Sequence, residues 1–175
     1  MILREVLEKV IEIIGDEDIS LDSESRKRTR LLSCANMIYH ELTTEYVQLK
    51  HKEIINFSDK RAYYSAFSKR VKDILGVYKY NQSVDFRMYP LYVESDINGD
   101  AEVSYLYHSD ELTLEDTVLL PPQYTAFVLA NGIAAEYFYR SGLTDEAVFY
   151  KNRYDTAVLN LSRRRQSVTL KAGRM

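Results

Sequence analysis

The stretch that decides the fold is LLPPQYTAFVLANGIAAEYFYRSGLTDEAVFYKNRYDTAVLNL, which runs from Leu119 to Leu161. We predict that it forms a helical hairpin. Pro121 and Pro122 suit the start of a helix, because proline needs no N–H there, and Gly142 suits the left-handed residue that ends one. Thr144 is then expected to cap a second helix, whose first turn carries two acids that favour the positive end of the helix dipole.

The first helix of this hairpin is apolar almost all round. Only four residues interrupt the apolar run between Tyr124 and Tyr139: Thr125, Asn131, Gly132 and Glu136. Such a helix is buried, and it is too short and too polar in the middle to cross a membrane, which takes about 20 mostly apolar residues. We therefore expect no membrane partner. The second helix is amphipathic and is expected to cover the first with one stripe of residues: Ala147, Tyr150, Tyr154, Val158 and Leu161.

Two further helices are expected ahead of this hairpin. Residues 2–14 indicate a short amphipathic helix closed by Gly15, and its recurring acids argue against a secretory signal, so the chain is expected to stay in the cytoplasm where it is made. A long helix then opens at Asp22 or Ser23 and reaches Leu49, because apolar residues recur at helical spacing through this segment.

After Lys52 the periodicity changes from helical to alternating. Short runs rich in Val, Ile, Tyr and Phe indicate antiparallel strands at 53–57, 61–67, 84–88, 91–94 and 102–107. The Asn98-Gly99 pair predicts a hairpin with a type I′ turn, and residues 68–75 predict a short helix lying over the sheet.

The predicted fold class is mainly α with a β insertion. An antiparallel four-helix core is expected from residues 1–51 and 109–161, with two helices from each end of the chain. A small antiparallel β-sheet is inserted at 52–108, and a basic tail follows at 162–175.

The composition argues against several classes of function. A net charge of −3 argues against a generic nucleic-acid binder. The single cysteine, Cys34, rules out a disulfide framework and a cysteine-rich zinc site, and its apolar neighbours favour a buried role over a reactive thiol. No phosphate loop, metalloprotease helix or nucleophile elbow occurs, and the histidines, His40, His51 and His108, lack ligand partners at suitable spacing. We expect no enzyme, no metal and no cofactor.

Two groups of charged residues leave alternatives open. The first turns of the long helix carry Arg26, Lys27, Arg28 and Arg30, which is mildly unfavourable at a helix N-terminus. These cations are either a solvated face or a surface that meets an acidic partner, a neighbouring subunit or DNA phosphate. Glu136 inside the most apolar helix is either a buried general base or, as its lack of a nearby nucleophile favours, the partner of an ion pair with a neighbouring helix or subunit.

Tyrosine is unusually abundant, with 15 tyrosines and no tryptophan. Tyrosine suits contact surfaces because it offers a large area at modest entropic cost. Many tyrosines fall in the predicted insertion, where they either form interfaces or fill the core of the small sheet: Tyr63, Tyr64, Tyr78, Tyr80, Tyr89, Tyr92, Tyr105 and Tyr107.

The order of segments resembles the head-tail connector, or adaptor, proteins of tailed bacteriophages. The residues that carry the resemblance are structural and span nearly the whole chain: CANMIYHEL at 34–42, the β insertion, LPP at 120–122, LANGIAAEY at 129–137, Gly142 with Asp145-Glu146-Ala147, and Tyr154 before the basic tail.

The resemblance implies a structural virion protein of the neck. Such adaptors form a homo-oligomeric ring, usually a dodecamer, beneath the portal protein; the ring extends the DNA channel and docks tail or neck proteins, and DNA passes through it without sequence-specific binding. By resemblance, the tail would contact the portal through five basic residues: Arg163, Arg164, Arg165, Lys171 and Arg174. The alternative hypothesis is a small nucleic-acid-binding regulatory protein that uses the basic clusters at 26–30 and 163–165.

Overall fold

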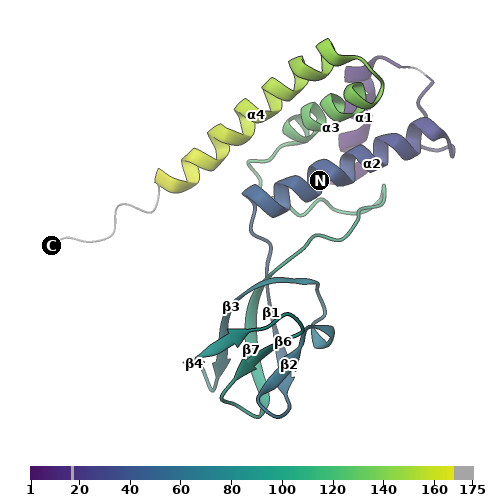
Figure 1. Cartoon of the computed structure of the whole chain (residues 1–175). Coiled ribbons are helices and arrows are strands. Elements are labelled where there is room, and N and C mark those ends of the chain that lie inside the picture. Colours follow the sequence, from purple (N-terminus) through teal and green to yellow (C-terminus); the bar gives the residue numbers. More distant parts are fainter. Residues whose placement is uncertain (17, 168–175) are drawn as a thin grey trace. The chain divides into compact units, whose positions relative to one another are not determined.

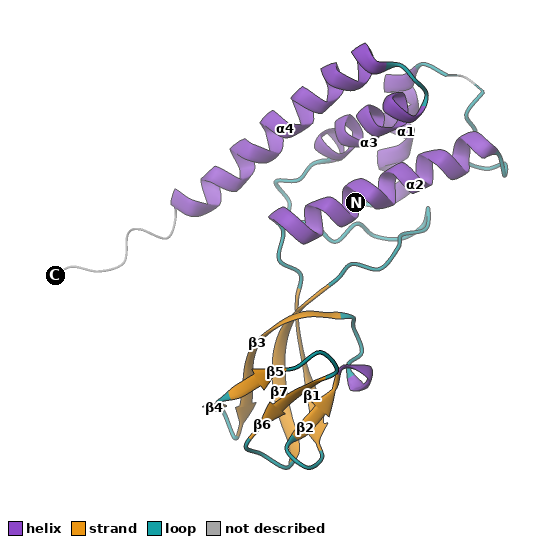
Figure 2. Ribbon diagram, in the orientation of Figure 1, coloured by secondary structure: helices purple, strands orange, loops and turns teal. Residues whose placement is uncertain are grey.

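The computed structural model describes residues 1–16 and 18–167, with side chains described up to residue 162. The chain forms two compact units: one contains Met1–Val47 and the segment from Glu111 onward, and the other is Gln48–Asp110. We refer to them as the helical unit and the β unit (Figure 2).

The predicted fold class was wrong. The protein is α+β: its described residues form four α-helices and seven strands, and the strands build two antiparallel sheets with a hydrophobic core of their own. A mainly α core with one small inserted sheet does not describe this. The physical reason is that the β unit buries its own apolar side chains and does not depend on the helices to cover them.

The helical unit consists of α1 (Leu3–Ile14), α2 (Arg26–Glu41), α3 (Ala126–Arg140) and α4 (Thr144–Ser167). Helix α3 contacts the other three (Figure 1). Ten of its fifteen residues are buried, so the prediction of a buried helix is confirmed. Helix α4 covers α3 and buries Ala147, Tyr154 and Val158 against it.

The helix boundaries follow local chemistry. Helix α2 begins after Ser25, whose hydroxyl accepts a hydrogen bond from the Arg28 N–H at 3.1 Å, and not at the predicted Asp22 or Ser23. It ends at Glu41, where a π-helical turn, Leu42–Tyr46, follows. Helix α3 begins four residues after the proline pair and is closed by Gly142, whose φ of 78° is left-handed as predicted.

The N-terminus is joined to the segment that precedes α3. The N–H groups of Leu3 and Arg4 donate to the carbonyls of Asp116 and Leu114, both at 3.0 Å. The Arg4 guanidinium adds ion pairs to Glu115 at 2.8 Å and to Asp22 at 2.9 Å. The two backbone hydrogen bonds supply partners for N–H groups that the first turn of a helix cannot satisfy internally.

The β unit contains a four-stranded and a three-stranded sheet. In the first, the order is β1-β7-β3-β4, with β1 at Lys50–Phe57, β7 at Gly99–Tyr107, β3 at Val71–Lys79 and β4 at Gln82–Val84. In the second, the order is β2-β6-β5, with β2 at Arg61–Tyr63, β6 at Tyr92–Ser95 and β5 at Phe86–Met88. A short 3₁₀ helix, Tyr64–Ala66, follows β2, and side chains from both sheets share the core.

Two local predictions in the β unit were wrong. Residues 68–75 do not form a helix, because Val71 begins the nine-residue strand β3. The Asn98-Gly99 pair does not close a hairpin, since the strands on either side of it, β6 and β7, belong to different sheets. Left-handed residue pairs occur instead at Asp59-Lys60 and Tyr80-Asn81, and Tyr80-Asn81 joins β3 to β4 through paired Lys79 and Gln82.

Candidate functional site

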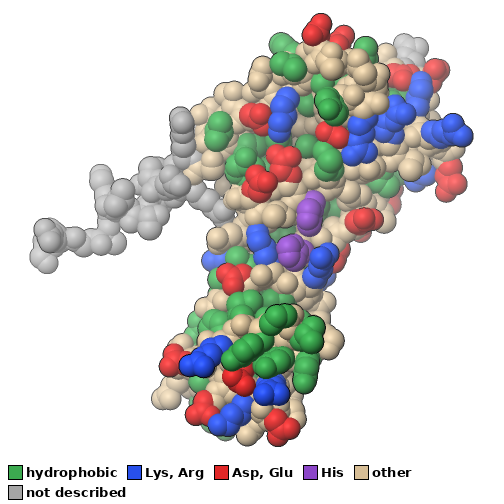
Figure 3. Space-filling model, viewed as in Figure 1, with side chains coloured by type: hydrophobic (Ala, Val, Ile, Leu, Met, Phe, Trp, Pro, Cys, Tyr) green, Lys and Arg blue, Asp and Glu red, His purple; other side chains and the backbone are tan. Residues whose placement is uncertain are grey.

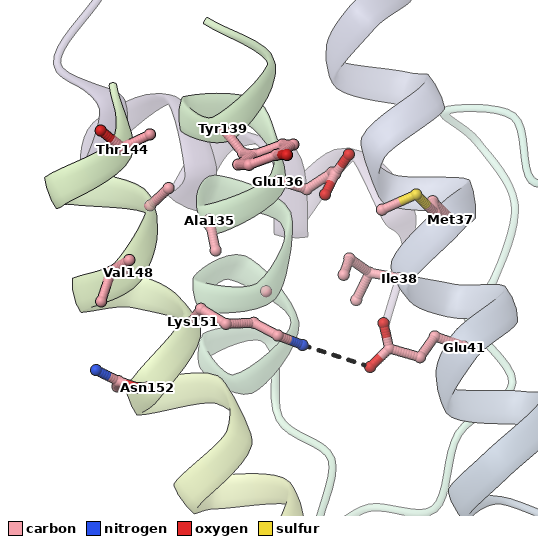
Figure 4. A pocket seen from close by; sticks show the side chains of 12 residues that line it. Met37, Ile38, Glu41, Ala135, Glu136, Tyr139, Thr144, Val148, Lys151 and Asn152 are labelled. Carbon is pink, nitrogen blue, oxygen red and sulfur yellow. Dashed lines mark ion pairs between the residues drawn. The ribbon is translucent and has the colours of Figure 1, made fainter. Parts of the chain in front are cut away.

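An open groove lies on the helical unit, with α2 and α4 as its walls and α3 as its floor (Figure 4). Its cavity volume is about 390 Å³. Its floor includes two small residues, Gly132 and Ala135, and the remaining lining combines polar and charged residues with five apolar ones: Met37, Ile38, Tyr139, Ala147 and Val148. We call this cavity the groove.

Several groove residues leave apolar surface exposed. Tyr139 is 68% exposed, Val148 59% and Met37 39%. A cavity lined mainly by apolar side chains with a few polar groups is the usual form of a binding site, and exposed apolar surface of this kind marks interaction surfaces.

An ion pair spans the groove between its two walls. The Lys151 ammonium on α4 lies 3.8 Å from a Glu41 carboxylate oxygen on α2, and 3.0 Å from Asp155 on its own helix. Burial by itself lowers the pKa of Lys151, but the hydrogen bond to Asp155 and the charge of Glu41 outweigh it and raise that pKa above its ordinary value. Lys151 therefore stays charged at neutral pH.

Tyr154 connects this ion pair to the interior. Its ring is 1% exposed and lies 4.9 Å from the Lys151 ammonium, and its hydroxyl donates to Glu41 at 3.4 Å. Burial, and next the charge of Glu41, raise the pKa of Tyr154 well above its ordinary value. The hydroxyl is therefore a permanent donor and does not act as a base at neutral pH.

Glu136 lies at the other end of the groove and pairs with its own helix. Its carboxylate accepts from the Arg140 Nε at 2.7 Å, one turn further along α3. Arg140 also donates to Ser33 Oγ at 3.1 Å and thereby links α3 to α2. The expected pair with a neighbouring helix is thus an intrahelical pair, and the geometry assigns Glu136 no role as a general base.

The four cations predicted to act together at 26–30 have different surroundings in the structure. Lys27 is neutralised locally, since its ammonium lies 2.7 Å from Asp16 and 3.4 Å from Asp18. Arg26, Arg28 and Arg30 line a second, wider depression of about 710 Å³, at the end of the helical unit where blue side chains gather in Figure 3. We call these three residues, together with Arg140, the arginine cluster.

Arg140 was missed as a member of this cluster. It lies on α3, 107 residues after Ser33 of α2 in the sequence, and only helix packing brings it beside Arg30. The pattern of the sequence offers no signal for that contact, because a single arginine near a helix C-terminus is common.

The predicted tail contacts fall largely outside the described residues. The backbone of Arg163, Arg164 and Arg165 continues α4, but their side chains are not described, and Lys171 and Arg174 lie beyond the last described residue. The structure therefore places none of these five side chains.

Of the eight tyrosines in the β unit, only Tyr105 lies fully in the core. Its hydroxyl donates to Glu53. Tyr64 and Tyr107 pack at the edge of that core. At the surface of the three-stranded sheet, the ring of Tyr92 stacks on that of Tyr89, with the ring centroids 4.9 Å apart. It also meets the ring of Tyr63, with the centroids 5.8 Å apart.

Elsewhere in the described part of the chain, few side chains are of a type that could react or bind a metal. Cys34 is buried, and burial raises the pKa of its thiol to about 11. The rings of His51 and Tyr105 form a T-shaped pair whose centroids lie 5.7 Å apart. Among the described residues, no three His, Cys, Asp or Glu side chains are grouped to hold a metal ion, and none of the described helices has the length and hydrophobicity to cross a membrane.

Comparison with known protein families finds no model that matches the sequence, and comparison with curated proteins finds no significant match.

Proposed function

We propose that the chain is a structural subunit of the virion neck, a head-tail connector that forms a homo-oligomeric ring under the portal protein. In this proposal the ring extends the DNA channel, docks tail or neck proteins, and lets DNA pass without sequence-specific binding. The observation that carries the proposal is the groove: an open, mainly apolar surface built from three helices, whose charged groups are already paired and are not poised for catalysis.

The exposed apolar side chains of this surface favour a macromolecular partner. Removing the exposed apolar side chains around the groove from water lowers the free energy of the complex. The decrease is roughly 25 cal/mol for each Å² of apolar surface buried. Met and Tyr, which stand at its rim, are enriched in protein–protein interfaces. The resemblance of the segment order to phage connectors supplies the kind of assembly.

The test is analytical ultracentrifugation of the full chain, alone and with the portal protein encoded near it. We expect either a ring of the free chain or a gain of many 20.4 kDa subunits on the portal. A truncation after Ser167 serves as the control for the tail, because it retains the whole of α4. A chain that remains monomeric both alone and with the portal would overturn the proposal.

A second candidate function is a nucleic-acid-binding regulator, and the arginine cluster favours it. The guanidinium groups around this depression could contact phosphates, for which arginine geometry is well suited. Such binding would weaken steeply as salt rises. Tight, salt-dependent binding to short duplex DNA by the monomer, lost in Arg26→Ala with Arg30→Ala, would support the regulator; binding unchanged in this variant would count against it.

A further inference from the structure

A second unpartnered surface lies on the other side of the α3–α4 hairpin. Phe127 on α3 is 53% exposed and Phe149 on α4 is 56% exposed. The Arg153 guanidinium lies 5.1 Å from the centroid of the Phe127 ring and 5.6 Å from that of the Phe149 ring. We call these three residues the aromatic patch.

The aromatic patch and the groove face different directions. An α-helix turns by about 100° per residue, so Arg153 projects from the far side of α4 relative to Lys151, which lines the groove. On α3, Phe127 and Asn131 border the patch, whereas Ala135 and Gly132 line the groove. One copy of the chain therefore carries two different surfaces on the same pair of helices.

The patch has the chemistry of an interface anchor. Aromatic residues and arginine dominate the binding energy of protein interfaces. Because the Arg153 guanidinium is already held over two rings, less side-chain entropy is lost when it binds. Beneath the patch, the Asn131 side chain donates to the Phe127 carbonyl of the same helix at 2.6 Å.

We propose that the aromatic patch of one copy docks into the groove of the next copy. This inference rests on the proposed ring and names the contact that builds it. The two phenyl rings enter the groove over Ala135, between Met37 on α2 and Val148 on α4. The occupant of the groove is thus a second copy of this chain.

The charges at the two surfaces match. The Lys151 ammonium at 3.8 Å and the Tyr154 hydroxyl at 3.4 Å both meet the same oxygen of the Glu41 carboxylate, Oε1, so the other oxygen, Oε2, retains acceptor capacity. A guanidinium binds a carboxylate through two parallel hydrogen bonds, and Arg153 is the cation at the patch. We assign Glu41 of one copy as the partner of Arg153 in the neighbouring copy.

This contact is heterologous, because the two surfaces that meet are different. A heterologous contact leaves one groove and one patch free at the ends of any short chain of subunits, so repetition builds a ring where the rotation between copies closes and an open filament where it does not. The proposed ring therefore needs only this one contact, repeated between successive copies.

The experiment uses two full-length variants, each of which disables one surface at an exposed side chain. Val148→Arg fills the groove with a cation that repels Arg153, and Phe149→Glu removes a ring from the patch. Ile54→Arg is the matched control, since it also changes an exposed apolar residue to a charge but lies in the β unit. Circular dichroism is used to check that all three variants fold, and ultracentrifugation measures their masses in the condition where the wild type assembles.

We expect each surface variant to be monomeric by itself and the Ile54→Arg control to assemble as the wild type does. An equal mixture of the two surface variants has one intact groove and one intact patch, so it should stop at twice the 20.4 kDa subunit mass. Variants that still form rings, or a mixture that stays monomeric, would overturn the contact while leaving the connector proposal standing. A wild-type chain that never assembles, with or without portal, would overturn both.

Discussion

Gly132 on α3 lies directly against the ring of Tyr154 on α4: a Cβ atom at residue 132 would be 2.8 Å from Cδ2 of that ring and 3.1 Å from Ile38 Cγ2. Glycine inside a helix costs about 1 kcal/mol relative to alanine. The close approach of three helices at this point explains why glycine is nevertheless present.

Gly132→Ala should destabilise the helical unit. Its better helix propensity is outweighed by the clash with a ring that is fully buried, and we expect the free energy of unfolding to fall by about 1–3 kcal/mol. Urea unfolding followed by helix circular dichroism measures this. In a Tyr154→Leu background, where the ring is absent, the same substitution should cost much less; an equal cost in both backgrounds would show that the ring is not the cause.

Asn36→Ala should weaken the attachment of the segment that precedes α3. The Asn36 side chain both accepts from the Leu112 N–H at 2.7 Å and donates to the Leu112 carbonyl at 3.0 Å. Loss of both bonds leaves two backbone groups without partners, at an expected cost of about 1–3 kcal/mol in unfolding free energy. Asn36→Asp retains the acceptor alone and should give an intermediate value; urea unfolding with no difference between Asn36→Ala and wild type would contradict this role.

Alkaline pH should destabilise the protein partly through Cys34. Burial raises the pKa of this thiol from 9.0 to about 11. The unfolded chain therefore loses the thiol proton at a lower pH than the folded chain does, and stability falls as the pH rises from about 9 through 11. Over that window the wild type should lose up to about 3 kcal/mol more unfolding free energy than Cys34→Ala. Parallel pH profiles for the two proteins would argue against the shift.

Substitutions in the Tyr80-Asn81 turn should make the β unit more stable. Both residues have left-handed φ angles, 51° and 62°, a conformation that costs a non-glycine residue about 1–2 kcal/mol, although asparagine tolerates it better. Tyr80 is 91% exposed, so little packing is lost on substitution. Tyr80→Asn with Asn81→Gly should stabilise the β unit by about 1 kcal/mol and raise its melting temperature in calorimetry, while Tyr80→Val should lower it. The reverse order would refute the turn assignment.

The helical hairpin was predictable because its signals are local. An all-round apolar run predicts burial wherever the helix lies, and Gly142 is left-handed for steric reasons that involve only its neighbours. Strand β3 was not predictable in this way. Val71, Ile74 and Leu75 recur at helical spacing, but register shifts between Val71 and Asp73 and between Ile74 and Gly76 break the alternation of the strand.

The sequence by itself determined the segments that are buried, the end of α3, and the shortage of recognisable catalytic motifs. Tertiary structure decided the fold class and the site. Lys27 is neutralised by acids of the preceding loop, Arg140 joins a cluster on another helix, and Glu41 meets Lys151 across the groove. Burial and helix termination depend on a few neighbouring residues, whereas the pairing of charges and the shape of a groove depend on which distant faces pack together, and hydrophobic patterning is too non-directional to specify that.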